Sequence, residues 1–310
     1  MTAKSIFSLS TGLLAVAALA LTGCTNASQQ GPAASASSSS SSFNVSTIQK
    51  DDALAAEVPQ ALRNKGTLVM GSDTSYAPAE FLGGTDGQTP IGYDVDLTKA
   101  IGALLGLKVD VQSAAFTSIL PSLGPKYDLS ASSFFITNAR KQAANFVSYL
   151  SAGTEWAVQK GNPKKFSLDD ICGRSIAVQT GSFQETKDLA DRNAKCAAAG
   201  KPAIKIVSLK NQTDVTTRLV NGSVDAMPAG SITIAYAITQ THGQLETFGD
   251  AYDASPVGIA VAKDDLPLTN LVAKAMNKLM QNGDYKKILD EWGVGNVAIS
   301  KAEVNPDVPK

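Results

Sequence analysis

Residues 96–111 read DLTKAIGALLGLKVDV, and this stretch predicts a helix that is followed directly by a strand. Apolar residues recur at helical spacing as far as Leu105, and Gly106 is typical of the position that ends a helix. Residues 108–111 then alternate polar and apolar side chains, as a half-buried strand does. Strand-like and helical runs alternate in this way over residues 67–130. Such an order predicts an α/β fold with parallel strands and right-handed crossovers.

The same order of elements begins again at residues 174–178, RSIAV, and indicates a second α/β lobe. Strand-like runs follow at residues 204–207 and 224–227, with a helical pattern between them at residues 214–220. A last strand-like run, at residues 257–261, precedes apolar residues at helical spacing. The helical patterns keep polar faces, so we interpret them as packing helices of a globular protein and not as membrane spans.

The composition of the 310-residue chain limits the functions that it can have. It carries 27 Lys and Arg against 28 Asp and Glu, so its formal net charge of −1 argues against a nucleic-acid partner. With one histidine, His242, and three cysteines, it has little material for a His-based catalytic triad or a zinc site. We therefore expect no metal and no cofactor, and an enzyme would have to use carboxylates, Lys, Tyr or Ser.

The first residues of the chain are typical of an export signal. Lys4 precedes an almost uncharged apolar run at residues 6–21, which is short for a membrane-spanning helix. The run ends in Leu21-Thr22-Gly23-Cys24, which closely resembles the lipobox of bacterial lipoprotein signals. In that family the cysteine thiol is acylated, palmitate being a typical chain, and becomes the first residue. We expect residues 1–23 to be a signal peptide and Cys24 to be lipidated, with a transmembrane anchor as the alternative.

Residues 24–64 are expected to tether the folded body to the membrane. From Thr25 to about Lys50 the chain is rich in Ser, Ala, Gln and Gly, and it includes the uninterrupted serine run at residues 37–42. Such a segment has too little apolar surface to offset the entropy of ordering, so it predicts a flexible tether. A short helix is predicted within residues 51–64.

Cys172 and Cys196 remain as an even pair once Cys24 is lipidated. Disulfides persist in exported proteins, so we predict a bond between these two cysteines, with two free buried thiols as the alternative. A metal site is a poorer interpretation, because no further Cys or nearby His completes a ligand set.

Seven segments, taken in order, resemble the polar amino-acid-binding branch of bacterial extracellular solute-binding proteins. They are residues 71–78 (GSDTSYAP), 92–97 (GYDVDL), 127–129 (YDL), 136–140 (ITNAR), 178–182 (VQTGS), 221–225 (NGSVD) and 282–293 (NGDYKKILDEWG). The resemblance covers residues 65–296, essentially the whole ordered body. It implies a two-lobed periplasmic-binding-protein-like α/β fold with two crossover hinge strands and a central ligand cleft.

The resemblance also implies how the chain is divided. Lobe one would comprise residues 65–152 and 258–297, lobe two residues 153–257, and a C-terminal tail residues 298–310. The hinge strands would lie near residues 151–155 and 254–257.

Arg140 matches the arginine that binds the ligand carboxylate in this family. A planar guanidinium is suited to hold a carboxylate with two parallel hydrogen bonds, and the alternative is a solvated surface arginine. From the other lobe, Gly181 and Ser182 end a strand and begin a helix, so free N–H groups and the helix dipole would meet the same carboxylate. Phe183 belongs to the same expected site. Two lobes that hold one anionic group would couple binding to closure.

Other positions match residues that surround the ligand in this family. Tyr76 and Phe116 fall where the family has aromatic walls, with a packing role as the alternative. Asp73 matches a position that in some members faces a basic ligand group, and it could equally be a turn residue or a helix cap. Ser132 and Ser133 lie just after a strand end, where members bond the ligand head group.

The chain departs from the family at two positions of the expected site. An acid that accepts the ligand's α-ammonium commonly lies five residues after Asp225, where this chain has Gly230. Phe135 stands where members usually have a small hydroxyl residue. An ammonium without an acceptor is poorly compensated in a dry cleft. Either the ligand lacks a standard α-amino group, or another acid such as Asp73 takes over, or the alignment slips by one residue.

The resemblance implies the membrane-tethered substrate-binding subunit of an ABC importer. It would clamp a small polar solute, an amino acid or a related carboxylate or amine, and deliver it to permease subunits. We expect an exported monomer, lipid-anchored to the outer face of the cell membrane, without nucleic-acid partner or enzymatic turnover. One alternative is a dehydratase-like enzyme on the same fold, for which Glu155, Glu185 and Asp225 are the available acids. A ligand-sensing lipoprotein is the other alternative.

Overall fold

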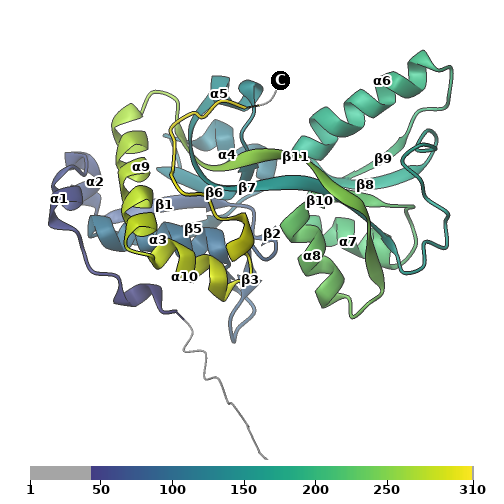
Figure 1. The fold of residues 1–310 in the computed structure, drawn as a ribbon. Helices are drawn as coiled ribbons and strands as arrows, with labels where there is room; N and C mark the ends of the chain where they lie inside the picture. Colours follow the sequence, from purple (N-terminus) through teal and green to yellow (C-terminus); the bar gives the residue numbers. More distant parts are fainter. Residues whose placement is uncertain (1–42, 309–310) are drawn as a thin grey trace, which may run out of the picture. The chain divides into compact units, whose positions relative to one another are not determined.

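Strands and helices alternate along the chain in the computed structural model, which describes residues 43–308 (Figure 1). The strands are β1 (Thr67–Ser72), β2 (Ser75–Tyr76), β3 (Glu80–Gly83), β4 (Thr89–Ile91), β5 (Lys108–Ser113), β6 (Leu129–Phe135), β7 (Ala144–Gln159), β8 (Ser175–Gln179), β9 (Lys205–Leu209), β10 (Met227–Gly230) and β11 (Leu245–Ala262). The helices are α1 (Asp52–Ala56), α2 (Gln60–Lys65), α3 (Tyr93–Leu105), α4 (Phe116–Ile119), α5 (Asn138–Ala143), α6 (Ala190–Ala198), α7 (Gln212–Val220), α8 (Ser231–Gln240), α9 (Leu266–Gln281) and α10 (Asp284–Glu291). Shorter helical turns are η1 (Val45–Thr47), η2 (Leu120–Ser122), η3 (Gln184–Leu189, a π-helix) and η4 (Gly295–Val297). The fold class is α/β, as the sequence predicts.

A six-stranded sheet in the order β10-β7-β11-β6-β1-β5 forms the framework of the molecule. In one half β1 pairs in parallel with β5 and β6, and in the other half β8 and β9 form a separate parallel pair. The long strands β7 and β11 pair antiparallel with each other and connect the halves (Figure 1). The parallel pairs agree with the sequence analysis. The crossing of β7 and β11 agrees with the two crossover hinge strands that the resemblance implies, whereas their antiparallel pairing is not predicted from the sequence.

The predicted hinge residues lie inside these two crossing strands. Residues 151–155 belong to β7 and residues 254–257 belong to β11, where Pro256 pairs with Ser151. The pairing becomes irregular between Tyr252 and Ser255. The lobe boundaries given above stay predictions.

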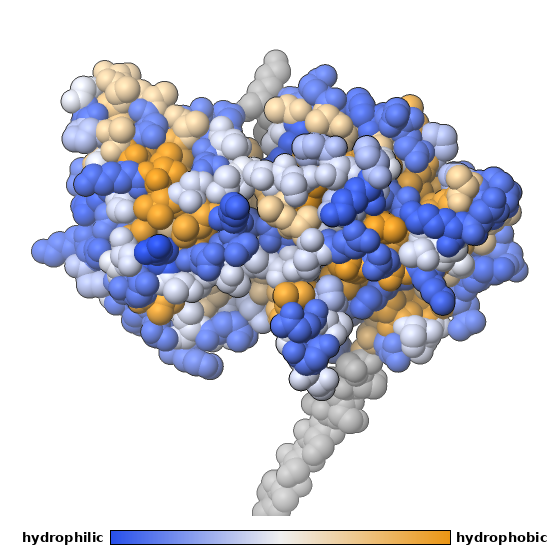
Figure 2. All heavy atoms as spheres, turned by 180° about the vertical axis from the view of Figure 1, so that it is seen from behind, coloured by the Kyte–Doolittle hydropathy of each residue, from blue (hydrophilic) through white to orange (hydrophobic). Residues whose placement is uncertain are grey.

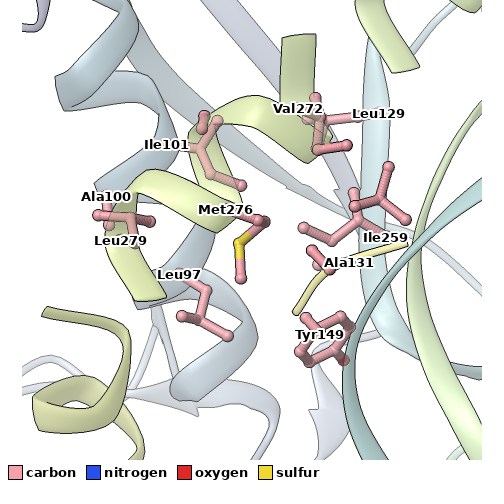
Figure 3. Close-up of a cluster of buried hydrophobic side chains, with 14 of the residues drawn as sticks. Leu97, Ala100, Ile101, Leu129, Ala131, Tyr149, Ile259, Val272, Met276 and Leu279 are labelled. Carbon is pink, nitrogen blue, oxygen red and sulfur yellow. The ribbon is translucent and has the colours of Figure 1, made fainter. Parts of the chain in front are cut away.

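Each half of the molecule has its own buried core. In one half, α3 and α9 pack against β6, β7 and β11, as Figure 3 shows for Leu97, Ala100, Ile101, Leu129, Ala131, Tyr149, Ile259, Val272, Met276 and Leu279. In the other half, Trp156 is completely buried and stacks on Phe166, with ring centroids 5.3 Å apart. Separate cores allow two halves of one chain to behave as two lobes.

The disulfide predicted between Cys172 and Cys196 is present. Its sulfur atoms are 1.97 Å apart and its Cα atoms 5.7 Å apart. The bond joins the segment before β8 to helix α6, beside the core around Trp156. Closing a loop over a sequence separation of 24 residues restricts the unfolded chain, which stabilises the fold by roughly 3 kcal/mol in the chain-entropy model.

Residues 43–50 pack against the folded body, which corrects the expectation that the flexible tether reaches Lys50. Phe43, Val45 and Ile48 contact the core formed by α3 and α9. These apolar side chains bury surface that the preceding Ser-rich stretch does not have. Helices α1 and α2 lie where a short helix is expected.

Part of the expected C-terminal tail, residues 298–310, is attached to the body. Ala298 pairs with Leu150 and Val304 with Val147, so the segment lies along β7. Ala302 is buried between these two pairs. The segment is attached through backbone hydrogen-bonding groups of β7 that no other strand uses. The polar sequence of the segment does not reveal this pairing.

The predicted signal peptide, the lipidated Cys24 and the serine run lie outside the described residues. None of the helices within residues 43–308 is both long and apolar enough to cross a membrane. The anchoring therefore stays a prediction.

The surface of the described residues is mostly polar. Figure 2 shows hydrophobic areas on one face that are separated by hydrophilic ones. Among the large hydrophobic side chains of residues 43–308, only Leu82 and Leu266 are exposed, at 40% and 51%. Most apolar side chains are therefore used in the cores.

Candidate ligand-binding cleft

A narrow cavity lies between the two halves and is lined by residues of both. Its lining consists of Tyr76, Phe116, Ser132, Ser133, Phe135, Arg140, Gln179, Ser182, Phe183 and Gln184. Eight of these residues are predicted from the sequence, whereas Gln179 and Gln184 are not. Of the other predicted residues, Asp73 and Gly181 contact the lining without being part of it. The cavity has a volume of only about 10 Å³, because its own side chains nearly fill it.

Arg140 occupies the centre of the contact between the halves. Thr137 caps helix α5 and accepts the Arg140 backbone N–H at 3.1 Å, which orients the first turn. The guanidinium donates to the carbonyl of Phe135 at 2.8 Å and, across the cleft, to the carbonyl of Gly181 at 3.0 Å. Burial lowers the pKa of Arg140 to about 10, so the side chain stays charged at neutral pH. A solvated surface arginine is therefore the wrong interpretation.

Aromatic rings surround the Arg140 guanidinium. The guanidinium carbon lies 5.3 Å from the ring centroid of Phe116 and 5.7 Å from that of Phe134. Phe135 and Phe183 stack on each other from opposite halves, with centroids 5.6 Å apart and planes 10° apart. The rings provide an apolar, cation-tolerant wall beside the guanidinium.

The loop that begins η3 differs from the expectation of free N–H groups. The Gly181 N–H donates to the Glu185 carboxylate at 2.6 Å, and the Glu185 N–H donates to the Ser182 hydroxyl at 3.2 Å. This arrangement is similar to a capping box, except that the acid bonds the N–H of Gly181, one residue before Ser182, while the Ser182 N–H donates to the Gln179 carbonyl. Gly181 instead faces Arg140 with its carbonyl oxygen.

Four hydrogen bonds join the halves around the cavity. Besides the bond from Arg140 to Gly181, Gln179 donates to Asp73 at 3.0 Å. The Gly230 N–H donates to the Tyr76 hydroxyl at 3.0 Å, and the Gln212 N–H donates to the Ser75 hydroxyl at 3.1 Å. The cleft is therefore closed, with polar groups of one half satisfied by the other.

Asp73 acts as a turn residue and as one of these links. One of its carboxylate oxygens accepts the Ser75 N–H and hydroxyl, at 3.2 and 2.7 Å. The other accepts the Phe116 N–H at 3.1 Å and the Gln179 amide. The side chain is 3% exposed, and burial raises the pKa of its carboxyl group.

Two buried acids that the sequence analysis does not single out support the cavity serines. Glu80 accepts the Ser132 hydroxyl at 2.8 Å, and Asp94 accepts the Ser133 N–H at 2.8 Å. Ser133 has a φ of 45°, a left-handed conformation that is uncommon for residues other than glycine, and the Asp94 bond helps to hold it. Asp94 lies in the quoted segment GYDVDL, but its partner is 39 residues away along the chain.

Gly92 places Asp94 at the start of α3. Its φ is 131°, and an added Cβ atom would lie 2.1 Å from the carbonyl oxygen of Ala79. The same carbonyl accepts the Asp94 N–H at 2.9 Å, which fixes the first turn of the helix. Glycine at this position is therefore required for the approach of the two backbones.

Because of the buried acids, we predict that the free energy of unfolding falls as the pH rises through the acidic range. Burial raises the pKa of Asp94 from 3.8 to about 6, and burial with the nearby Asp94 charge raises the pKa of Glu80 well above its usual range. Between about pH 4 and pH 6 the folded state then holds more protons than the unfolded state. Lowering the pH from 7.5 to 5 should raise the melting temperature, with Asp94 contributing about 1 kcal/mol over this interval.

Calorimetry of the wild type and of Asp94→Asn at several pH values would check this prediction. The variant should show a shallower dependence on pH, since the amide does not titrate. Equal slopes in both proteins would contradict the assignment to Asp94.

The comparisons with known proteins agree with this geometry. Residues 68–295 match the family described as bacterial extracellular solute-binding proteins, family 3. The chain is 34% identical over 251 residues to the arginine-binding protein ArgT of Corynebacterium glutamicum, covering 81% of this chain and 82% of the relative.

Two solved structures are similar over most of the described body. An ancestral arginine-binding protein bound to arginine has a TM-score of 0.66 at 30% identity, covering 73% of this chain and 98% of the other. The ancestral amino acid-binding protein AncCDT-1, a precursor of cyclohexadienyl dehydratase, has a TM-score of 0.64 at 29% identity, covering 75% and 97%. The fold, its cleft and the match over residues 68–295 assign this chain to the bacterial extracellular solute-binding proteins, family 3.

Proposed function

We propose that this protein captures a small carboxylate-bearing solute between its two lobes and delivers it to the permease of an ABC importer. The observation that carries the proposal is the position of Arg140, the charged group of a cavity that both halves of the chain line. A ligand carboxylate can accept from the guanidinium in place of the Gly181 carbonyl, so a bound ligand would bridge the lobes. Binding would thereby be coupled to closure.

Amino acids and their relatives are the first ligand class to test. ArgT and the ancestral structure are described as binding arginine, so arginine heads the panel. The cleft of this chain adds its own constraint, because it presents one guanidinium and an aromatic wall. The carboxylate of a ligand would bind the guanidinium, and a compact or planar remainder of the ligand would pack on the aromatic wall.

We propose binding without turnover. The acids considered for an enzyme serve other contacts: Glu185 caps its own helix, and Asp225 accepts the Ser175 N–H at 2.9 Å. Glu155 lies on β7 and does not line the cavity. The likeness to AncCDT-1 makes a dehydratase the second candidate. NMR of the bound ligand over several hours should show it unchanged, and its consumption would favour the enzyme.

Export and anchoring complete the proposal. A signal peptide at residues 1–23 and lipidation of Cys24 would hold the monomeric receptor at the outer face of the cell membrane. Mass spectrometry of the mature protein tests this directly. A thioether-linked diacylglycerol on Cys24 is expected, and an unmodified N-terminus starting before Cys24 would exclude the anchor.

A thermal-shift panel on the purified full chain tests the binding function. Amino acids, their deaminated and acylated analogues, and amines would each be added at millimolar concentration. We expect at least one carboxylate to raise the melting temperature by several degrees, because ligand at about 100 times its Kd contributes about 2.7 kcal/mol of stability. A response to amines alone would contradict the carboxylate site.

A further inference from the structure

We propose that the ligand of this protein is a carboxylic acid that carries no ammonium group on the carbon next to its carboxylate. The proposal rests on the proposed function in that the ligand carboxylate binds Arg140. The charges around Arg140, the hydrogen bonds of the neighbouring acids and the surroundings of Gly230 support it.

Arg140 is the only charged residue among the ten that line the cavity. The other lining residues are aromatic, hydroxyl or amide side chains. An α-amino acid whose carboxylate binds Arg140 would bring its ammonium group close to the guanidinium. Like charges disfavour each other, and a desolvated ammonium needs an anionic partner. The lining of this cavity has no such partner.

Asp73 contacts the lining residues Phe116 and Gln179, but its carboxylate is fully used. Each of its two oxygens accepts two donors, from Ser75 on one side and from Phe116 and Gln179 on the other. A carboxylate has about four lone-pair positions, so the four donors leave none for a ligand ammonium. Recruiting Asp73 would require the loss of its link to Gln179 across the cleft.

Glu80 and Asp94 are shielded by the serines that they hold. Ser132 and Ser133 line the cavity, whereas both acids are completely buried. Their oxygens without hydrogen-bond partners, Oε2 of Glu80 and Oδ1 of Asp94, are buried from solvent as well. Burial also raises the pKa of both carboxyl groups, which disfavours their negative charge. Neither acid offers an exposed carboxylate to a ligand.

The surroundings of Gly230 show where an acceptor would have to stand. A Cβ atom at this residue would lie 3.1 Å from the Tyr76 hydroxyl and 3.6 Å from the Phe135 ring. The backbone at Gly230 has a φ of −61° and a ψ of 140°, which any residue can adopt. An aspartate here would therefore present its carboxylate beside two residues of the cavity wall. In this chain residue 230 is a glycine, so the position has a hydrogen atom in place of a side-chain carboxylate.

Phe135 adds a second reason why the cavity disfavours an ammonium group next to the ligand carboxylate. The carbonyl of Phe135 accepts one N–H of the Arg140 guanidinium, so Phe135 adjoins this group. The Phe135 ring stacks on Phe183 from the other half, and both residues line the cavity that Arg140 also lines. The ligand carbon beside the carboxylate would pack on these rings, where a methylene or planar oxo carbon is accommodated better than an ammonium.

Matched ligand pairs that differ only in the α-ammonium test the proposal. Isothermal titration of the full chain would compare L-arginine with 5-guanidinopentanoate, L-leucine with 4-methylpentanoate, and L-glutamine with glutaramate. The deaminated member should bind at least 10-fold tighter in the pair that binds best. Agmatine, which keeps the guanidinium and lacks the carboxylate, should not bind.

Gly230→Asp should reverse the preference, improving the amino acid at least 10-fold relative to its deaminated partner. Gly230→Ala is the matched control, because it adds the same Cβ atom without a charge and should leave the preference unchanged. Tighter binding of the amino acids by the wild type, lost in Asp73→Asn, would overturn this inference and leave the proposed function intact. Failure of every carboxylate to bind would overturn the proposed function and this inference with it.

Discussion

Arg140→Ala is expected to weaken binding of the best carboxylate ligand by at least about 100-fold, corresponding to about 3 kcal/mol. Hydrogen bonds to charged groups contribute about 1.5–3 kcal/mol each, and a guanidinium can make two of them to one carboxylate. The alanine also leaves the carbonyl oxygens of Phe135 and Gly181 without their donor. Isothermal titration of the wild type and the variant measures the loss.

Two further arginine variants make this result specific. Arg140→Lys keeps the charge without the paired donors, so an intermediate loss is expected. Arg174→Ala removes an arginine that bonds Asp170 and lies outside the cavity, and its affinity should equal that of the wild type. Unchanged affinity in Arg140→Ala would end the carboxylate assignment.

Gly92→Ala is expected to lower the free energy of unfolding by more than about 3 kcal/mol. A residue other than glycine in such a backbone conformation costs on the order of 1–3 kcal/mol, and the new Cβ atom adds a backbone clash. The clash is with the Ala79 carbonyl oxygen, 2.1 Å away, which also binds the Asp94 N–H. The first turn of α3 must therefore shift, and Asp94 with it.

Urea denaturation of Gly92→Ala and Gly87→Ala would separate the clash from the loss of glycine. Gly87 also has a positive φ, 65°, but an added Cβ atom would meet nothing within 4 Å. Its replacement should cost only about 1 kcal/mol. Equal losses in the two variants would show that the contact with Ala79 does not matter.

The sequence predicts the cleft better than it predicts the ends of the body. Arg140 and Ser182 are both predicted because each lies in a recognisable segment, and both line the cavity. The packing of residues 43–50 and 298–305 is missed, because three scattered apolar side chains and one strand edge produce it. Such contacts leave no periodic pattern in the chain.

Glu80 and Glu185 show what local patterns cannot reveal. Glu80 follows an ordinary turn in the sequence, and its role arises from a hydrogen bond to Ser132, 52 residues away. Glu185 takes the N–H of Gly181, which the start of a helix alone would leave free for a ligand. Where a polar group finds its partner depends on the folded distances and not on the order of residues.

The sequence by itself determines the α/β class, the pairing of Cys172 with Cys196 and, through the family resemblance, eight of the ten residues that line the cleft. Hydrophobic spacing, cysteine number and short motifs are local properties, so they can be read before folding. Only the tertiary structure decides that β7 and β11 pair antiparallel with each other and that Arg140 meets Gly181. It also decides that the nearby acids are already bonded, because burial and hydrogen-bond partners exist only once distant segments are packed together.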